Sequence, residues 1–213
     1  MNCEERKQDG LKYIQEDNYK KALEIFCVLL YENPKDKELF EISMFLFGRI
    51  TDAHYDFQPE TAEEFLFRGV ARFYHGELEN SILDYNVALK IYPKSDYALK
   101  CKAFSLTHQK NYLLAIEELK KAIEINPHGE YFDDIAENLS RAGMNKEAIE
   151  YHEKAITASP NEPRLWYNYG THLGKMNMIA NAVIKLQKAV DLYPQYDDAK
   201  YNLDYYYKKL QNL

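Results

Sequence analysis

The sequence contains few of the residues that interrupt helices. Only 8 glycines and 7 prolines occur among its 213 residues. Both residues weaken the interior of a helix or strand, so their scarcity favours helices joined by short connections. Hydrophobic residues make up 46% of the chain, which is enough for a substantial core and argues against wholesale disorder. We therefore expect an all-α protein.

The sequence also lacks features that nucleic-acid-binding, membrane-spanning and disulfide-bonded proteins have. The formal net charge is −7 and no run of five basic residues occurs, so no nucleic-acid-binding surface is expected. The N-terminus, MNCEERKQDG, is charged, and no apolar stretch approaches the roughly 20 residues that span a bilayer. Cys3, Cys27 and Cys101 are odd in number and far apart, which favours free thiols in a reducing compartment. We expect a cytoplasmic protein without a membrane partner.

Motifs of catalysis and metal binding are absent from the sequence as well. It has no glycine-rich phosphate loop, HExxH, nucleophile elbow or CxxC pair. His75 and His108 lie 33 residues apart, but we interpret them as solvated residues near turns rather than as metal ligands. His152 stands at a large core position and is expected to be packed and hydrogen-bonded. We predict no catalytic residue, no metal, no cofactor and no enzymatic activity.

The clearest internal pattern lies between residues 163 and 196. Its marked positions are Trp166, Tyr169, Gly170, Leu173, Ala182, Leu186, Ala189 and Pro194. The spacing W-x2-Y-G-x2-L…A-x3-L-x2-A…P resembles the tetratricopeptide repeat, a 34-residue unit of two antiparallel helices. Large apolar groups still occupy the large positions, so Trp166 is expected to be buried. The resemblance implies a right-handed α-solenoid of antiparallel helix pairs.

The same register extends along most of the chain. Prolines that end successive units stand at 59, 93, 127, 160 and 194, with spacings of 34, 34, 33 and 34 residues. Gly76 and Gly143 mark turns inside units, and Asn111 is expected to cap the helix after it. Small residues recur at matching positions, namely Gly69, Ala103, Ala136 and Gly170 in first helices and Ala115, Ala148 and Ala182 in second helices. They are expected to let the paired helices approach closely.

These marks divide the chain into one continuous array of units. The predicted units are 3–36, 37–60, 62–95, 96–128, 129–162 and 163–196, followed by a C-terminal capping helix at 197–213. The unit 37–60 is shortened and degenerate. Its segment 38–50, ELFEISMFLFGRI, is apolar over most of a helix circumference. It is interpreted either as a helix wedged into an irregular bend of the solenoid or as a dimer or partner surface.

The resemblance also implies where a partner binds. In this family the first helix of each unit lines a concave groove that takes an extended or helical peptide. The matching candidate residues are Leu66, Phe67, Phe73, Tyr97, Lys100, Phe104, Glu130, Asp133, Asp134, Glu137, Arg164, Tyr167, Asn168, Thr171, Tyr201, Asn202 and Tyr205. They form an apolar, aromatic N-terminal part, an acidic middle and a C-terminal part rich in Tyr and Asn.

Two groups within this set have distinct chemistry. The four acidic residues between 130 and 137 follow an i, i+3, i+4, i+7 spacing that places them on one helical face. They either oppose a Lys or Arg of the partner or form a solvated face partly neutralised by Lys100 and Arg164. Asn168 and Asn202 stand at the same position of successive units, where their amides could hold a peptide backbone. A similar asparagine arrangement occurs in the O-linked N-acetylglucosamine transferase family, whereas the clamp for chaperone C-terminal tails is not present.

The predicted function is therefore a non-enzymatic protein–protein interaction module. Its partner is expected to be a protein or peptide, with a basic segment in one interpretation. The alternative is a self-assembling structural protein that dimerises through 38–50 or through the Tyr-rich helix at 197–213. A third interpretation is a subunit or regulator of an enzyme encoded elsewhere. Binding by repeat arrays depends on surface residues, so the fold does not identify the partner.

Overall fold

The computed structural model describes residues 3–32, 42, 46 and 58–211, and all secondary-structure elements in these residues are helices. The first four are α1 (Cys3–Gln15), α2 (Tyr19–Glu32), α4 (Ala62–Tyr74) and α5 (Leu78–Ile91). The others are α6 (Asp96–His108), α7 (Tyr112–Ile125), α8 (Gly129–Arg141), α9 (Asn145–Ala158), α10 (Pro163–Lys175), α11 (Ile179–Leu192) and α12 (Asp197–Gln211). The predicted all-α fold is confirmed. Apart from Ile42 and Leu46, the apolar segment predicted at 38–50 lies outside the described residues.

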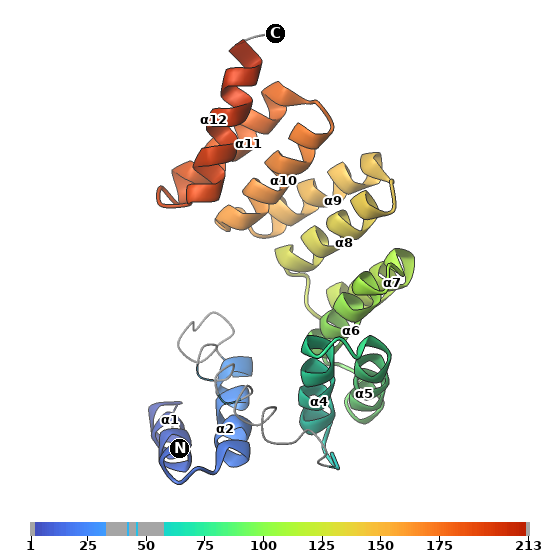
Figure 1. Cartoon of the computed structure of the whole chain (residues 1–213), viewed down its shortest axis with the longest axis vertical. Helices are drawn as coiled ribbons and strands as arrows, with labels where there is room; N and C mark the ends of the chain where they lie inside the picture. Colours follow the sequence, from blue (N-terminus) through green and yellow to red (C-terminus); the bar gives the residue numbers. More distant parts are fainter. Residues whose placement is uncertain (1–2, 33–41, 43–45, 47–57, 212–213) are drawn as a thin grey trace. The chain divides into compact units, whose positions relative to one another are not determined.

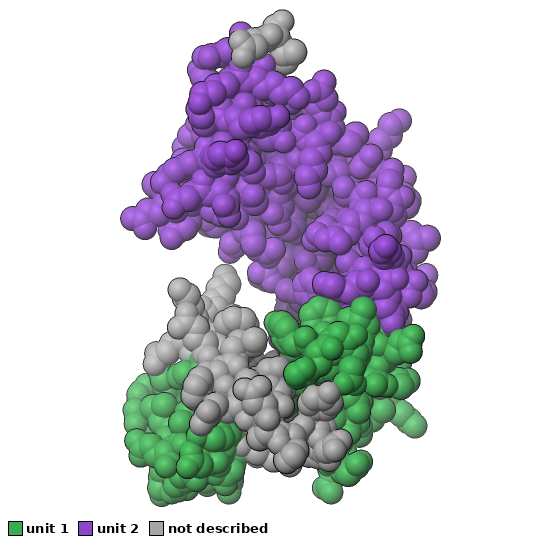
Figure 2. Space-filling view, viewed as in Figure 1, with its two compact units in different colours: residues 1–92 green, residues 93–213 purple. Residues whose placement is uncertain are grey.

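The chain forms two compact units, residues 1–92 and residues 93–213 (Figure 2). Successive helices pack as antiparallel pairs, as the tetratricopeptide resemblance implied (Figure 1). Unit 1 contains the pairs α1/α2 and α4/α5. Unit 2 contains the pairs α6/α7, α8/α9 and α10/α11, and α12 packs against α11. We call α6, α8, α10 and α12 the first helices of unit 2.

The turns inside the pairs repeat the predicted register. Gly76 and Gly143 have φ of 79° and 80°, a left-handed conformation that glycine adopts at little cost. The equivalent turns of α6/α7 and α10/α11 use Lys110 and Asn177, with φ of 63° and 60°. The four residues are 34, 33 and 34 positions apart. The turns are therefore set by the repeat geometry, which overrides the preference for glycine.

A side chain caps the start of α4 but not the start of α7. Thr61 and Glu64 form a reciprocal capping box at α4, in which the Thr61 side chain accepts from the Glu64 backbone N–H at 3.2 Å. Asn111 stands at the N-cap of α7, but its side chain makes no capping hydrogen bond. Its amide instead donates to Gln109 at 3.2 Å. The predicted N-cap position of Asn111 is therefore confirmed, although its side chain does not make the capping hydrogen bond.

Small residues bring the paired helices together. A Cβ added to Gly170 would lie 2.7 Å from Cγ of Leu186 and 3.2 Å from the backbone oxygen of Ala182. At Gly69 it would lie 2.5 Å from the ring of Tyr85. Such separations leave no room for a methyl group. The predicted close approach at these positions is confirmed.

Trp166 is less buried than its place in the repeat predicted. It is absent from the buried core, whereas its neighbour Leu165 is fully buried. The indole Nε1 donates to the backbone oxygen of Pro160 at 2.8 Å, and the Lys185 ammonium lies 5.3 Å from the ring centroid. The ring therefore covers the side of the α10/α11 pair and remains partly open to solvent, so the prediction of a buried Trp166 is wrong.

The core of unit 1 joins α2 to α4. Ala22, Phe26 and Leu29 of α2 are fully buried, and Ala71 of α4 packs in the same cluster. Phe67, one of the predicted groove residues, also packs against this cluster. Its side chain thus contributes to the unit 1 core.

Candidate functional site

Glu130 links three successive first helices of unit 2. Its Oε2 lies 2.8 Å from Nζ of Lys100 on α6, and its Oε1 lies 3.2 Å from Nη2 of Arg164 on α10. Burial alone would raise the pKa of Glu130, but the two cations outweigh burial and lower this pKa to about 2. Lys100 and Arg164 therefore neutralise the acidic helix α8 in part, as one of the two sequence interpretations anticipated.

Asp133 is buried, and each of its carboxylate oxygens has a hydrogen-bond partner within the chain. Only 3% of the residue is exposed. Its Oδ1 pairs with Nδ1 of His152 at 3.0 Å, and its Oδ2 accepts from Nδ2 of Asn168 at 2.7 Å. Arg164 adds a cation 3.7 Å from Oδ2. A buried carboxylate with this many partners acts as a structural junction between α8, α9 and α10.

Asp134 is also buried but has fewer partners. The residue is 8% exposed, and its Oδ2 makes no hydrogen bond among the described residues. The closest cation is Nζ of Lys100 at 3.9 Å. Burial raises the pKa of Asp134 to about 7, and repulsion from Asp133 adds to this effect while Lys100 opposes it. Two of the four predicted groove carboxylates are thus buried, so α8 does not present a simple solvated acidic face.

Glu137 differs from the two aspartates. Its side chain is 55% exposed and pairs with Arg141, one helical turn later, at 2.6 Å. An exposed i, i+4 pair contributes little to stability because solvent screens it. Glu137 is therefore the most exposed of the four predicted carboxylates of α8.

Both predicted asparagines already donate within the chain. Asn168 donates to Asp133, as described above, and Nδ2 of Asn202 donates to the Tyr167 hydroxyl at 3.2 Å. The Tyr167 ring packs against Tyr196 with centroids 5.0 Å apart. Thr171, another predicted groove residue, donates its hydroxyl to the backbone oxygen of Asn168 at 2.8 Å. One N–H of each asparagine is therefore committed to holding neighbouring first helices together.

Several predicted groove aromatics of unit 2 remain accessible. Tyr97 and Phe104 of α6 are 47% and 40% exposed, and Tyr201 and Tyr205 of α12 are 75% and 53% exposed. In unit 1 the predicted residues Leu66, Phe67 and Phe73 are only partly exposed. Among the candidate residues, the accessible aromatic side chains therefore lie on α6 and α12.

Three hydrogen bonds between first helices share one sequence separation, which we did not predict from the sequence. Tyr131 donates its hydroxyl to Asp96 at 2.8 Å. This pair, like Asn168–Asp133 and Asn202–Tyr167, is separated by 35 positions. A search for polar pairs one repeat plus one residue apart would have found all three. These bonds hold each first helix to the next one along the chain.

A second polar group lies deeper in unit 2. The imidazole of His152 stacks on Tyr169 with centroids 5.3 Å apart, and its centroid lies 5.2 Å from that of His172. His172 lies within 3.2 Å of the Ser140 hydroxyl through Nδ1, and burial lowers its pKa. The prediction that His152 is packed and hydrogen-bonded is confirmed.

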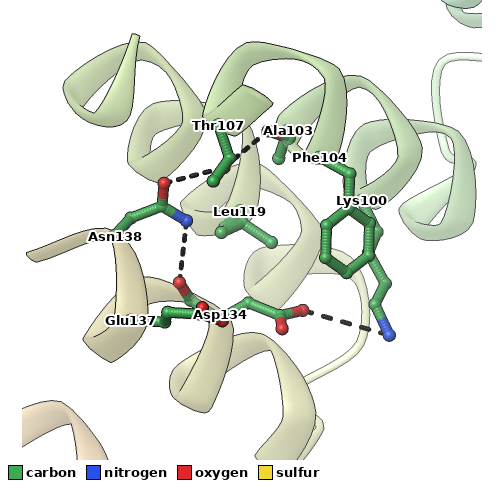
Figure 3. Close-up of a pocket in the computed structure, with 8 residues that line it drawn as sticks. All are labelled: Lys100, Ala103, Phe104, Thr107, Leu119, Asp134, Glu137 and Asn138. Atoms are coloured by element: carbon green, nitrogen blue, oxygen red, sulfur yellow. Dashed lines mark hydrogen bonds and ion pairs between the residues drawn. The ribbon is translucent and has the colours of Figure 1, made fainter. Parts of the chain in front are cut away.

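A small cavity opens between α6 and α8 beside these contacts (Figure 3). It measures about 10 Å³ and is lined by Lys100, Ala103, Phe104, Thr107, Leu119, Asp134, Glu137 and Asn138. We call it the Asp134 pocket. Asn138 is fixed at its edge, since its Oδ1 accepts from the Thr107 hydroxyl at 2.7 Å and its Nδ2 donates to the Asp134 backbone oxygen at 2.8 Å. Asn138 therefore forms a fixed polar part of a wall that also contains Ala103, Phe104 and Leu119.

The described residues also bear on catalysis, metal binding and membrane insertion. Within the described ranges, no three His, Cys, Asp or Glu residues are grouped so as to hold a metal ion. Cys101 is buried, and burial raises the pKa of its thiol to about 12, which disfavours the reactive thiolate. None of the described helices combines the length and apolar character needed to cross a bilayer.

Known proteins show the same architecture. A family model described as tetratricopeptide repeat matches residues 102–128. No curated protein matches the sequence. The fold is similar to that of YrrB, described as a tetratricopeptide-repeat protein with an unusual peptide-binding site, with 19% identity and a TM-score of 0.54 over 78% of this chain and 84% of that one.

Two further structures are similar over most of this chain. The thermophilic repeat protein TTC0263 of Thermus thermophilus has 13% identity and a TM-score of 0.61, with 96% of this chain and 98% of that chain covered. The Cut9–Hcn1 structure has 16% identity and a TM-score of 0.67, with 91% of this chain and 40% of that chain covered. The repeat match at residues 102–128 and the shared helix-pair fold agree with the tetratricopeptide-repeat architecture that the sequence predicted.

Proposed function

We propose that the first helices of unit 2 bind an extended segment of a partner protein and that the chain is a non-enzymatic interaction module. The exposed aromatic groups at groove positions of α6 and α12 carry this proposal. Phe104 and Tyr201 are 40% and 75% exposed, although large aromatic side chains are usually buried. Aromatic residues are enriched at protein interfaces because they combine a large apolar area with few rotatable bonds. The repeat protein YrrB, of the same fold, is described as having a peptide-binding site.

The hydrogen bonds between successive first helices of unit 2 also favour binding. Three hydrogen bonds between successive first helices hold Tyr131, Asp133 and Asn202 in place. A preformed surface loses less conformational entropy when it binds. The exposed Glu137 carboxylate and the net charge of −7 favour a partner segment that carries Lys or Arg.

A random-peptide phage library selected against the full-length chain tests this proposal. Enriched peptides should bind the wild-type chain and lose affinity for the double variant Phe104→Ala/Tyr201→Ala. Tyr193→Ala is the matched control, because Tyr193 is 50% exposed but lies at the end of the second helix α11. Failure to enrich any peptide would contradict the proposal. So would equal affinity for the wild type and the double variant.

A second function is favoured by the surface of α12. Tyr207 and Leu210 add to its exposed apolar residues, with exposures of 52% and 36%. Tyr207 and Trp166 also line an open hollow of about 480 Å³ against α11. A group of exposed aromatic and aliphatic side chains on one helix suits association with a second copy. Light scattering over a concentration series tests it: a dimer that Tyr207→Asp dissociates supports self-assembly, and a monomer at every concentration contradicts it.

A further inference from the structure

The Asp134 pocket contains a carboxylate that shares its nearest cation, Lys100, with Glu130. Each neighbouring carboxylate of α8 has a closer partner: Glu130 lies 2.8 Å from Lys100, and Glu137 lies 2.6 Å from Arg141. Lys100 remains 3.9 Å from Asp134, beyond hydrogen-bond distance. In Figure 3 a dashed line marks this long ion pair between the Asp134 carboxylate and the Lys100 ammonium.

This arrangement is unfavourable for an empty pocket. Asp134 is 8% exposed, and its Oδ2 makes no hydrogen bond within the described residues. A buried, charged oxygen without a donor costs more free energy than almost any other polar group. The same surroundings raise the pKa of Asp134 to about 7, mainly through burial. A cation that entered the pocket would remove this penalty.

The dimensions of the pocket limit what can enter. A cavity of about 10 Å³ corresponds to roughly one water molecule. The ammonium group of lysine is compact and has three donors, whereas the guanidinium of arginine is a wide planar fork. The pocket therefore favours the compact end of a lysine side chain over the wider guanidinium of an arginine.

The walls of the pocket match the rest of a lysine side chain. Phe104 is 40% exposed and forms one wall, so its ring can cover the methylene stem and attract the positive charge. Glu137, at the rim, presents a second acceptor that is 55% exposed. Glu130 and Glu137 already have close cations in Lys100 and Arg141, so Asp134 is the carboxylate of the lining that a further cation would balance.

We propose, as a refinement of the peptide-binding function above, that the Asp134 pocket binds the ammonium group of one lysine of the partner segment. Asp134 and Glu137 accept its hydrogen bonds, and Phe104 covers its stem. Lys100 stays on Glu130. The site discriminates lysine from arginine by size and from acetyl-lysine or glutamine by charge.

Small-molecule probes test the pocket without any knowledge of the partner. The ¹⁵N-labelled full-length chain is titrated with n-butylammonium, n-butylguanidinium and 1-butanol, at a pH above the pKa of about 7 of Asp134. n-Butylammonium should shift the Asn138 side-chain amide and the Phe104 and Asp134 backbone amides saturably. n-Butylguanidinium should bind at least several-fold more weakly, and 1-butanol should not bind. Absence of saturable shifts, or equal shifts with 1-butanol, would overturn the proposal.

Single-residue variants test whether the n-butylammonium shifts arise at the Asp134 pocket. Asp134→Asn keeps the side-chain shape and should abolish the n-butylammonium shifts, while Glu150→Gln removes an exposed carboxylate of α9 and should leave them unchanged. Circular dichroism checks that both variants fold. Phe104→Leu, which alters an exposed ring, should weaken the shifts without affecting the fold. Shifts that persist in Asp134→Asn would overturn the proposal.

Peptides selected on the wild-type chain separate this inference from the proposed function. Replacing one particular lysine by arginine or glutamine should weaken binding by about ten-fold, as loss of a hot-spot contact does. The same loss should occur when the unchanged peptide meets Asp134→Asn. Peptides that bind but tolerate every lysine replacement would overturn the lysine pocket and leave the peptide-binding function intact. If no peptide is selected, the peptide-binding function fails, and the titration still decides the pocket.

Discussion

Nδ2 of Asn168 on α10 donates a 2.7 Å hydrogen bond to Oδ2 of Asp133 on α8. The pair joins two successive first helices of unit 2 at a sequence separation of 35 residues. Asp133 is 3% exposed, and its other oxygen pairs with His152 on α9. Asn168 therefore stabilises a buried charge, in addition to any contact that it makes with a partner.

Asn168→Ala should lower the free energy of unfolding by about 1–2 kcal/mol, because Asp133 loses a donor while staying buried. Urea unfolding measures the change. Asn181→Ala is the matched control, since Asn181 is exposed on α11 and should be nearly neutral. Equal effects of the two substitutions would show that the Asn168–Asp133 bond does not stabilise the fold.

Gly170→Ala should destabilise the chain by about 1–3 kcal/mol through overpacking. The new methyl group would lie 2.7 Å from Cγ and 3.1 Å from the backbone nitrogen of Leu186. The Leu186 backbone cannot rotate away as a flexible side chain can, so α10 and α11 must separate. Thermal unfolding together with hydrogen exchange of α11 measures this effect. A variant as stable as the wild type would show that the pair tolerates separation.

Asp134 should make the stability of the fold fall as the pH rises from about 4 to 7. Its pKa is about 7 in the folded chain, against an ordinary value of 3.8, so the folded state binds this proton more tightly. The resulting stabilisation is present below pH 4 and is lost as the pH rises through 7. Asp134→Asn lacks this dependence. Urea unfolding across this pH range should therefore show the wild type losing stability relative to Asp134→Asn. The loss should amount to a few kcal/mol, because each unit of pKa difference between the folded and unfolded chain corresponds to about 1.4 kcal/mol.

The opposite slope, or parallel pH profiles of the two proteins, would contradict the raised pKa of Asp134. The variant Glu130→Gln provides a control, because Glu130 has the opposite pH dependence. Lys100 and Arg164 lower the pKa of Glu130 to about 2, so its contribution stabilises the fold at neutral pH. That contribution is lost as the pH falls through 2, at the acidic end of the range.

Trp166→Ala should cost about 1–2 kcal/mol, less than the 3–5 kcal/mol of a fully buried tryptophan. The indole is partly exposed and packs against Lys185. Leu165→Ala, at the fully buried neighbouring position, should cost about 2–5 kcal/mol. Acrylamide should also quench the fluorescence of Trp166, the single tryptophan in the chain. A Trp166 that is shielded from acrylamide, or a larger loss than for Leu165→Ala, would contradict its partial exposure.

The sequence predicted the helix pairs because their requirements are local and periodic. The spacing of small residues such as Gly69 and Gly170 reflects direct contact between paired helices, and each added Cβ would clash. Turn glycines such as Gly76 reflect a left-handed backbone. These constraints recur in every unit, so a pattern about 34 residues long identifies the fold.

The burial of individual groove residues could not be predicted from the same pattern. Asp133 is buried because His152 and Asn168, 19 and 35 residues away, supply its partners. Trp166 is partly exposed because of how α10 and α11 pack beside it. Each outcome depends on which side chains meet across helices, and helical spacing alone describes only one helix at a time.

Peptide affinity provides the most direct test of whether the first helices of unit 2 form a binding surface. Fluorescence anisotropy would measure a display-selected peptide against the wild type, Phe104→Ala/Tyr201→Ala and Tyr193→Ala. We predict that the double variant binds at least about ten-fold more weakly, as expected for loss of exposed aromatic anchors, while Tyr193→Ala binds as the wild type does. Equal affinity of all three proteins would contradict a binding surface on these helices.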